Sequence, residues 1–270
     1  MYSLKSKKPK TKDHILDTAD TKDVKAVIRT KKEAFAVDMF LYSGLRVSEL
    51  LHMRRSWLDF KDGFIIIPEK QKCNCVNCKN ERKYLERKLK ESNNFIVFKK
   101  YVGDKNWSKV DVYRFRDEAE RKINEIKKDN PSVQCKIDIK KPNEHQLLRL
   151  DGYWVPKTEF SVRSTIRIVD EIKDVLIDFF KNHNSVLEVF KARNYFNRVL
   201  KRIEKRSGVK LFPHALRGTF ATGLAKMDYS PLEMKQICGW SSVDTANYYI
   251  LLSRRTIKKT YDKKWNSEVI

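Results

Sequence analysis

The chain has 270 residues, with 58 Lys or Arg against 35 Asp or Glu and a formal net charge of +23. Its hydrophobic share of 41% excludes a disordered chain, and its charge favours a polyanionic partner, although a lysine excess can also serve only to solubilise a surface. No apolar run approaches the roughly 18 residues of a membrane helix, and no apolar segment follows the basic start, so we expect a cytoplasmic protein without membrane contact.

The first part of the chain is predicted to be mainly helical. Residues 1–19 form a lysine-rich arm that can lie along phosphates or remain a solvated tail. From Asp20 onward, apolar residues recur at helical spacing as far as a break at Gly44, and a further helix follows that break. A turn then leads into a short buried strand over residues 64–67, which Pro68 ends.

Residues 70–148 are predicted to be an insertion, because a cysteine cluster, charged helical sequence such as "DVYRFRDEAERKINEIKKDN" and isolated prolines follow one another there. A second strand pair is predicted around Asp151 and Gly152, a turn signal with β-branched and aromatic flanks. The last third is predicted to be helical, with Gly208 as a helix stop. The expected fold class is α+β, mainly helical with a small antiparallel sheet plus an inserted charged segment.

Two segments place arginine at structurally marked positions. Cutting a phosphodiester without a metal requires a nucleophile, cations for the growing phosphate charge and an acid for the leaving oxygen. In "YSGLRVSEL", Arg46 lies at a helix junction and Glu49 can orient it by an ion pair. In "PHALRGTF", His214 and Arg217 lie three residues apart and project from one side of a helix. Each pair can also be structural, as a surface ion pair or a helix cap.

A third segment, "CGWSSVDTANYY", ends in two adjacent tyrosines. Either Tyr248 or Tyr249 can face inward on a helix that begins near Thr245, so periodicity does not choose between them. Trp240, which follows a glycine, can equally belong to the core.

Taken in this order, "SGLRVSEL", "HALRGTFAT" and "GWSSVDTANYY" resemble the motifs of the tyrosine recombinase or phage integrase family, in particular its archaeal and viral integrases. The resemblance covers about Asp20 to Tyr261 apart from the insertion. It makes Tyr249, nine residues after Trp240, the nucleophile. The family also uses a lysine on a β-hairpin, and "YWVPKTEFSVRSTIRI" resembles that hairpin, which favours Lys157 over Lys70.

The resemblance implies site-specific DNA recombination or integration through a 3′-phosphotyrosyl intermediate. Its catalytic residues would be Arg46, Lys157, His214, Arg217, Trp240 and Tyr249. Lys157 would protonate the leaving oxygen, and the others except the nucleophile would hold the phosphate, Trp240 by packing and its indole N–H. The Tyr249 anion would form either because guanidiniums favour it or because His214 accepts the proton. Neither ATP nor a catalytic cofactor is implied.

The implied partners are double-stranded DNA and further copies of the chain, as a tetramer on DNA. The segment "SRRTIKKTYDKKW" would be a tail that exchanges between subunits or a helix packed on its own domain. The alternatives are a type IB topoisomerase-like activity and a catalytically idle DNA-binding module.

The sequence departs from the family in two places. Residues 20–270 correspond to the catalytic domain, and no N-terminal core-binding domain precedes them. The stretch "KCNCVNCKN" places Cys73, Cys75 and Cys78 close together, where they would bind a structural zinc with Cys135 or His145, or remain reduced thiols. An odd number of cysteines without a secretory signal argues against a disulfide scaffold.

Overall fold

The computed structural model describes residues 14–91, 95–113, 115–139 and 142–253. The chain divides into two compact units, of which the first runs up to Gln71 and resumes at Pro156, and the second is Lys72–Val155. The second unit therefore occupies nearly the range predicted for an insertion. Most of the predicted basic arm and nearly all of the predicted exchanging tail lie outside the described residues.

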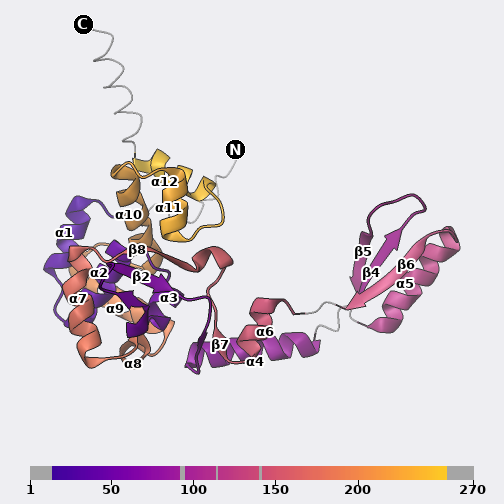
Figure 1. The fold of residues 1–270 in the computed structure, drawn as a ribbon, viewed down its shortest axis with the longest axis horizontal. Helices are drawn as coiled ribbons and strands as arrows, with labels where there is room; N and C mark the ends of the chain where they lie inside the picture. The colour runs from indigo at the N-terminus through magenta and orange to yellow at the C-terminus, as the bar shows by residue number, and fades with distance from the viewer. Residues whose placement is uncertain (1–13, 92–94, 114, 140–141, 254–270) are drawn as a thin grey trace, which may run out of the picture. The chain divides into compact units, whose positions relative to one another are not determined.

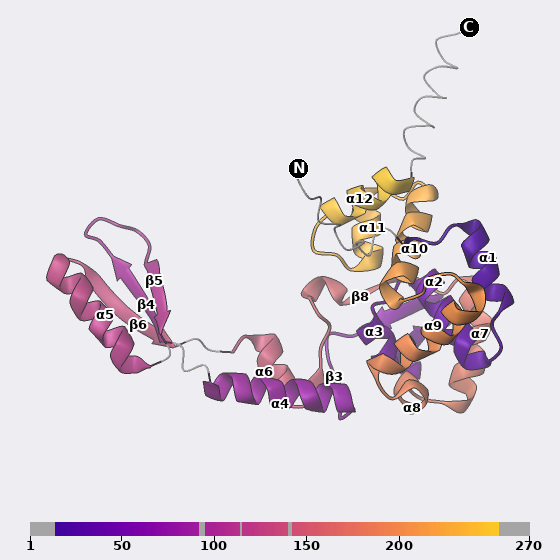
Figure 2. The same cartoon turned by 180° about the vertical axis from the view of Figure 1, so that it is seen from behind.

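The first unit is built mainly from helices, which surround a small sheet (Figures 1 and 2). Its helices are α1 (Thr18–Ala26), α2 (Lys31–Ser43), α3 (Val47–His52), α7 (Asp170–Asn182), α8 (Val186–Phe190), α9 (Arg193–Ser207), α10 (Pro213–Lys226), α11 (Pro231–Cys238) and α12 (Asp244–Ser253). Two short 3-10 turns, η2 (Arg55–Trp57) and η3 (Glu159–Ser161), also belong to this unit.

The ends of these helices follow local sequence signals. The side chain of Thr30 accepts a hydrogen bond from the Glu33 N–H at 3.2 Å and so begins α2. Gly44, in the left-handed conformation, ends the same helix, and Gly208 ends α9 in the same way. The predicted break at Gly44 and the predicted stop at Gly208 are thus confirmed.

Helix α2 forms the centre of the core of the first unit. Its apolar side chains are almost wholly buried, and Phe35 stacks on Phe179 with ring centroids 4.0 Å apart. On its other side Phe40 meets Phe196 edge to face at 5.4 Å. Helices α7, α9 and α10 all pack on α2, so this helix fixes the position of the α3 N-terminus that follows it.

The sheet of the first unit has three antiparallel strands in the order β1 (Leu58–Asp59), β2 (Phe64–Ile67) and β8 (Arg163–Arg167). Ile65 pairs with Ile166, and both are buried. The strand predicted over residues 64–67 is confirmed. Because β8 joins β2, a segment about a hundred residues later in the sequence comes back beside the first helices.

The strand pair predicted around Asp151 and Gly152 is wrong. The residues before this turn form helix α6 (Glu144–Leu150), which begins with a capping box between Asn143 and Gln146. After the turn comes the two-residue strand β7 (Tyr153–Trp154), in a two-stranded sheet with β3 (Gln71–Lys72). The local capping signal outweighs the turn signal.

The second unit also contains strands that its charged sequence hides. It comprises α4 (Val76–Glu91), β4 (Phe95–Lys100), β5 (Ser108–Tyr113), α5 (Arg116–Asp129), β6 (Gln134–Ile139), α6 and β7. Strand β4 is central in an antiparallel sheet ordered β5, β4, β6. The helical interpretation of "DVYRFRDEAERKINEIKKDN" is therefore partly wrong, since "DVY" ends β5 and the helix α5 covers only Arg116–Asp129.

Helices with small antiparallel sheets make up both units, and the predicted α+β class is confirmed. Within the part of the chain that the structure describes, no helix combines the length and the apolar character needed to cross a bilayer.

Candidate active site

Arg46 is the residue immediately before α3, and Glu49 lies in the first turn of that helix. Arg46 Nη1 donates to Glu49 Oε1 at 2.8 Å and to Ser161 Oγ at 2.7 Å, while Nη2 donates to the carbonyl of Gly239 at 2.6 Å. The ion pair suggested by the three-residue spacing is therefore present. Because 22% of the Arg46 side chain remains exposed, its guanidinium can still meet a ligand.

Glu49 is buried and forms an ion pair with a second arginine, Arg163 on β8. Arg163 Nη2 donates to Glu49 Oε2 at 3.1 Å, and its Nε donates to the Ile237 carbonyl at 2.9 Å. Burial alone would raise the pKa of the Glu49 carboxyl. The charges of Arg163, Arg217 and Arg46 outweigh burial and lower this pKa to about 2. One carboxylate thus balances a cluster of guanidiniums.

The sequence does not single out Arg163, which is a buried residue of this cluster. It lies 114 positions from Glu49, and nothing in its neighbourhood marks it as different from the exposed Arg167 on the same strand. Glu49 could have indicated such a partner, because a glutamate on a buried helix face requires more than one hydrogen-bond donor.

Arg217 and His214 lie on the first turns of α10. The Arg217 side chain is buried, donating through Nη1 to the Gly44 carbonyl and through Nη2 to the Cys238 carbonyl at 2.5 Å. Burial lowers the pKa of Arg217 to about 10, which leaves the group charged at neutral pH. His214 keeps part of its ring open to solvent, yet partial burial lowers its pKa, and so do the charges of Arg217, Lys157 and Arg46.

The two arginines meet at the C-terminal end of α11. Arg217 binds the carbonyl of Cys238, and Arg46 binds that of the next residue, Gly239. Gly239 has φ of +64° and is closely surrounded: a Cβ there would lie 2.6 Å from Arg163 Nη1 and 2.9 Å from the Phe160 carbonyl. Only glycine fits this position.

Trp240 and Tyr249 lie directly beyond this junction. Their rings stack with centroids 5.4 Å apart and an interplanar angle of 7°, whereas Tyr248 meets Tyr249 edge to face. The Tyr249 hydroxyl comes so close to α10 that a Cβ at Gly218 would be 3.6 Å from it. Burial raises the pKa of Tyr249, while the charge of Arg217 also acts on its hydroxyl and favours a lower pKa, so the structure brings this hydroxyl near the arginine.

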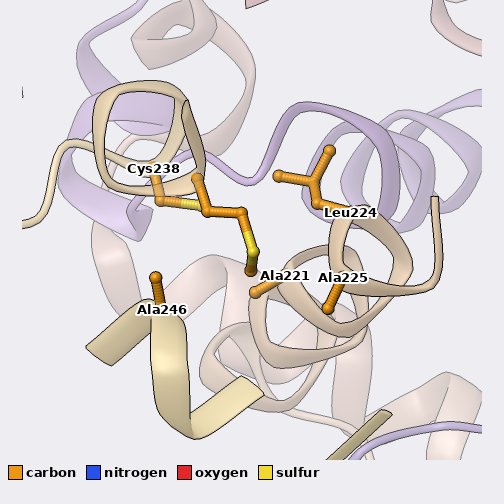
Figure 3. Close-up of a cluster of buried hydrophobic side chains, with 6 residues drawn as sticks. Ala221, Leu224, Ala225, Cys238 and Ala246 are labelled. Carbon is orange, nitrogen blue, oxygen red and sulfur yellow. The ribbon is translucent and has the colours of Figure 1, made fainter. Parts of the chain in front are cut away.

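A small apolar cluster holds these rings in place. It joins α10, α11 and α12 through Ala221, Leu224, Ala225, Met234, Cys238 and Ala246 (Figure 3). Trp240 and Tyr249 pack against this cluster. Most of its members are small, so the three helices approach closely. The orientation of Tyr249 therefore depends on backbone packing.

Lys157 lies in an exposed bend between β7 and η3, so its predicted place on a β-hairpin is wrong. Its charge nevertheless contributes to the lowered pKa of His214. The structure thus associates Lys157 with the same group of cations as Arg46 and Arg217. The exposed position leaves the ammonium able to approach a substrate.

The predicted metal ligands Cys73, Cys75 and Cys78 lie in the second unit. Their Sγ atoms are all within 4.8 Å of one another. Among the described residues, neither Cys135 nor His145 joins this group, so the fourth ligand predicted from the sequence is not supported.

Residues 163–255 match the model of the phage integrase family. Tyrosine recombinase XerA of Saccharolobus solfataricus is 27% identical over 114 residues, which are 42% of this chain and 39% of that protein. The alignment thus spans well under half the length of this curated relative.

Among solved structures, the Tn1549 transposon integrase in complex with transposon right end DNA is similar, with a TM-score of 0.50 and 18% identity. The alignment covers 95% of this chain and 68% of that chain. A complex of the same integrase with a circular intermediate DNA gives a TM-score of 0.51, also at 18% identity, and covers 95% and 67%. These likenesses concern the fold.

The matched region contains Arg163, His214, Arg217, Trp240 and Tyr249, all of them part of the geometry described above. Over residues 163–255 the chain is therefore similar to the phage integrase family, and part of the chain is similar to a tyrosine recombinase.

Proposed function

We propose that this protein is a site-specific DNA recombinase that breaks and rejoins DNA through a phosphotyrosyl intermediate, with Tyr249 as the nucleophile. The proposal is supported by the match of residues 163–255 to the phage integrase family model and by the DNA complexes of the similar integrase. The net charge of +23 suits a polyanionic substrate.

One observation carries the proposal. Two arginines from distant segments, Arg46 and Arg217, bind consecutive carbonyls immediately before Trp240. Arg46 is partly exposed, and Tyr249 packs on the same helix that carries Arg217. A phosphate placed at Arg46 would therefore meet two guanidiniums and a tyrosine hydroxyl, which are the cations and the nucleophile that metal-free phosphoryl transfer needs.

In the proposed reaction Tyr249 Oη forms a bond to the scissile phosphorus, and the bond between phosphorus and the 5′ oxygen breaks. The phenolic proton passes to His214, and the departing 5′ oxygen takes a proton from Lys157. Arg46 and Arg217 stabilise the charge on the non-bridging oxygens. The 5′-hydroxyl of an incoming strand reverses these steps. The phosphodiester energy is retained in the tyrosyl link, so rejoining requires no ATP.

The ionisation of the two titratable groups favours His214 as the base. Burial raises the pKa of Tyr249 above its ordinary value, and the charge of Arg217 offsets this only in part. The pKa of His214 is lowered, so the ring is neutral at pH 7 and able to accept a proton. Of the two routes to the phenolate considered above, proton transfer to a base is the one that these directions support.

The pH dependence of cleavage tests this role. Because the pKa of His214 lies below its ordinary 6.5, we expect the single-turnover cleavage rate to hold down to that pH and to fall only in more acidic solution. A His214→Gln variant should be slower by roughly 100-fold and should lose this acidic fall. An unchanged acidic fall in the variant would assign it to another group.

Substitution of Trp240 tests whether the stack or the indole N–H matters. A Trp240→Phe variant keeps an aromatic face for Tyr249 and should retain most of the rate of covalent complex formation. Trp240→Ala removes a stack of the kind worth about 0.5–1.5 kcal/mol and should slow the reaction roughly 2- to 12-fold. If both variants slow equally, the N–H is the important group. Thermal unfolding of each variant serves as the control for folding.

The test of the proposed function is covalent capture from a pool of duplexes with randomised sequence and a nick near the middle. The nick lets the short cleaved strand diffuse away and so traps the phosphotyrosyl link. DNA that stays attached to the full chain in denaturant is then sequenced. Recovery of a common sequence supports the proposal, and recovery no greater than from the Tyr249→Phe variant would refute it.

The recovered sequence also separates a recombinase from a topoisomerase-like enzyme. A recombinase should form adducts on a plasmid that carries the sequence and leave a plasmid without it supercoiled. Recombination between two duplexes breaks four strands, one for each nucleophile, so we propose a tetramer as the assembly on DNA.

A further inference from the structure

We infer that Cys73, Cys75 and Cys78 bind one zinc ion as thiolates and so fix the beginning of α4. The three residues lie in the sequence "KCNCVNCKN", where Cys73 follows β3, Cys75 precedes α4 and Cys78 lies in its first turn. Cys73 and Cys78 are buried, and Cys75 is partly exposed. The inference does not depend on the recombinase activity.

The spacing of the sulfur atoms suits zinc. All three Sγ atoms are within 4.8 Å of one another. A tetrahedral ion with Zn–S bonds of about 2.3 Å places its sulfur ligands about 3.8 Å apart. The thiols therefore need to close by only about an ångström or less, a distance that rotation about χ1 supplies. None of the five cysteines of the chain, all of them among the described residues, forms a disulfide.

The backbone around the thiols is arranged to support negative sulfur. The Cys78 N–H donates to Cys75 Sγ at 3.5 Å, and the residue 79 N–H donates to the Cys75 carbonyl at 2.9 Å to begin the helix. The N-terminal end of a 16-residue helix also favours negative charge at this place. The Cys73 N–H donates to the Gly152 carbonyl at 3.0 Å, so the strand side of the loop is fixed as well.

Three thiolates without a cation would repel one another, and soft sulfur ligands select zinc over the hard cations Mg²⁺ and Ca²⁺. Zinc would join the residue that follows β3 to the first turn of α4 across a loop of a few residues. Its consequence is structural: without the ion, the first turn of α4 would lose its connection to the strand.

The experiment measures the metal bound to the full chain. The purified protein should contain about one zinc per chain, and Co²⁺ in its place should give thiolate-to-cobalt charge-transfer bands with the visible spectrum of a tetrahedral site. X-ray absorption of the zinc form should count three sulfur ligands. Cys75→Ser should reduce bound zinc to less than about a tenth, and it is the variant to use because this side chain is only partly buried.

Cys135→Ser is the matched control, since it removes a thiol outside the cluster and should leave the zinc content unchanged. Far-UV circular dichroism verifies that both variants are folded. Equal zinc content in the wild type and Cys75→Ser, or a metal-free wild type with all three thiols reactive toward a thiol reagent, would overturn the inference.

Discussion

Replacement of Tyr249 by phenylalanine is expected to abolish the covalent protein–DNA complex, with a fall in cleavage rate on the order of 10⁴-fold or more. The change removes only the hydroxyl oxygen. The ring that stacks on Trp240 remains, so the packing of α12 on α10 and α11 should be preserved. The measurement is the yield of adduct on a nicked duplex after denaturation.

Tyr248→Phe is the matched control, because it removes the same atom from the neighbouring side chain. It should form the adduct at close to the wild-type rate. Mass spectrometry of the adduct after digestion should find the nucleotide on Tyr249. If the adduct were lost in the Tyr248 variant and retained in the Tyr249 variant, the nucleophile would be Tyr248. The stack of Tyr249 on Trp240 would then not identify the nucleophile.

Glu49→Gln is expected to destabilise the protein by about 3–5 kcal/mol and to impair cleavage as well. Glutamine keeps the shape of the side chain but removes the charge that balances Arg46 and Arg163 inside the protein. The guanidiniums would then repel one another, and Arg46 would lose the group that orients it. Denaturant unfolding measures the first effect and single-turnover cleavage the second.

Glu33→Gln provides a control for a buried acid away from the candidate site. Glu33 pairs with Arg206 at 2.7 Å. Its substitution should lower stability without a comparable loss of cleavage at temperatures where the variant is folded. If Glu49→Gln were as stable and as active in cleavage as the wild type, the arginine cluster would not need the Glu49 carboxylate.

Glu49 should also make the stability of the protein depend on pH in acidic solution. The pKa of Glu49 falls from 4.5 to about 2 in the folded protein, so its contribution is complete above pH 4.5 and is lost as the pH falls toward 2. The shift corresponds to about 3 kcal/mol. Between these pH values the free energy of unfolding should fall more steeply with decreasing pH in the wild type than in Glu49→Gln, because glutamine gains no proton at this position.

Much of the first unit could be predicted because its signals are local. The glycines at positions 44 and 208 end helices by a conformation that glycine adopts without cost, and the apolar run over residues 64–67 has a single reasonable interpretation as a strand. The motif order also led to residues that the structure brings into one region, including Arg46, His214 and Arg217.

The missed features depend on contacts between distant residues or on competing local signals. Arg163 matters because Glu49 is beside it in space, and no spacing within β8 reveals that partner. Strand β4 is short, and the charged sequence around it favours helix until its two neighbours pair with it. Residues 144–150 form a helix that Asn143 caps, whereas the prediction of a strand pair rested on the turn residues Asp151 and Gly152.

The attachment of Arg46 and Arg217 to main-chain oxygens has a consequence for how the sequence can vary. A carbonyl is the same in every amino acid, so the residue at position 238 can change without removing the acceptor that Arg217 uses. Position 239 has no such freedom, because its Cβ would meet Arg163. At position 238 the limit on substitution is therefore the space in the apolar cluster and not the hydrogen bond, whereas at position 239 any side chain would meet Arg163.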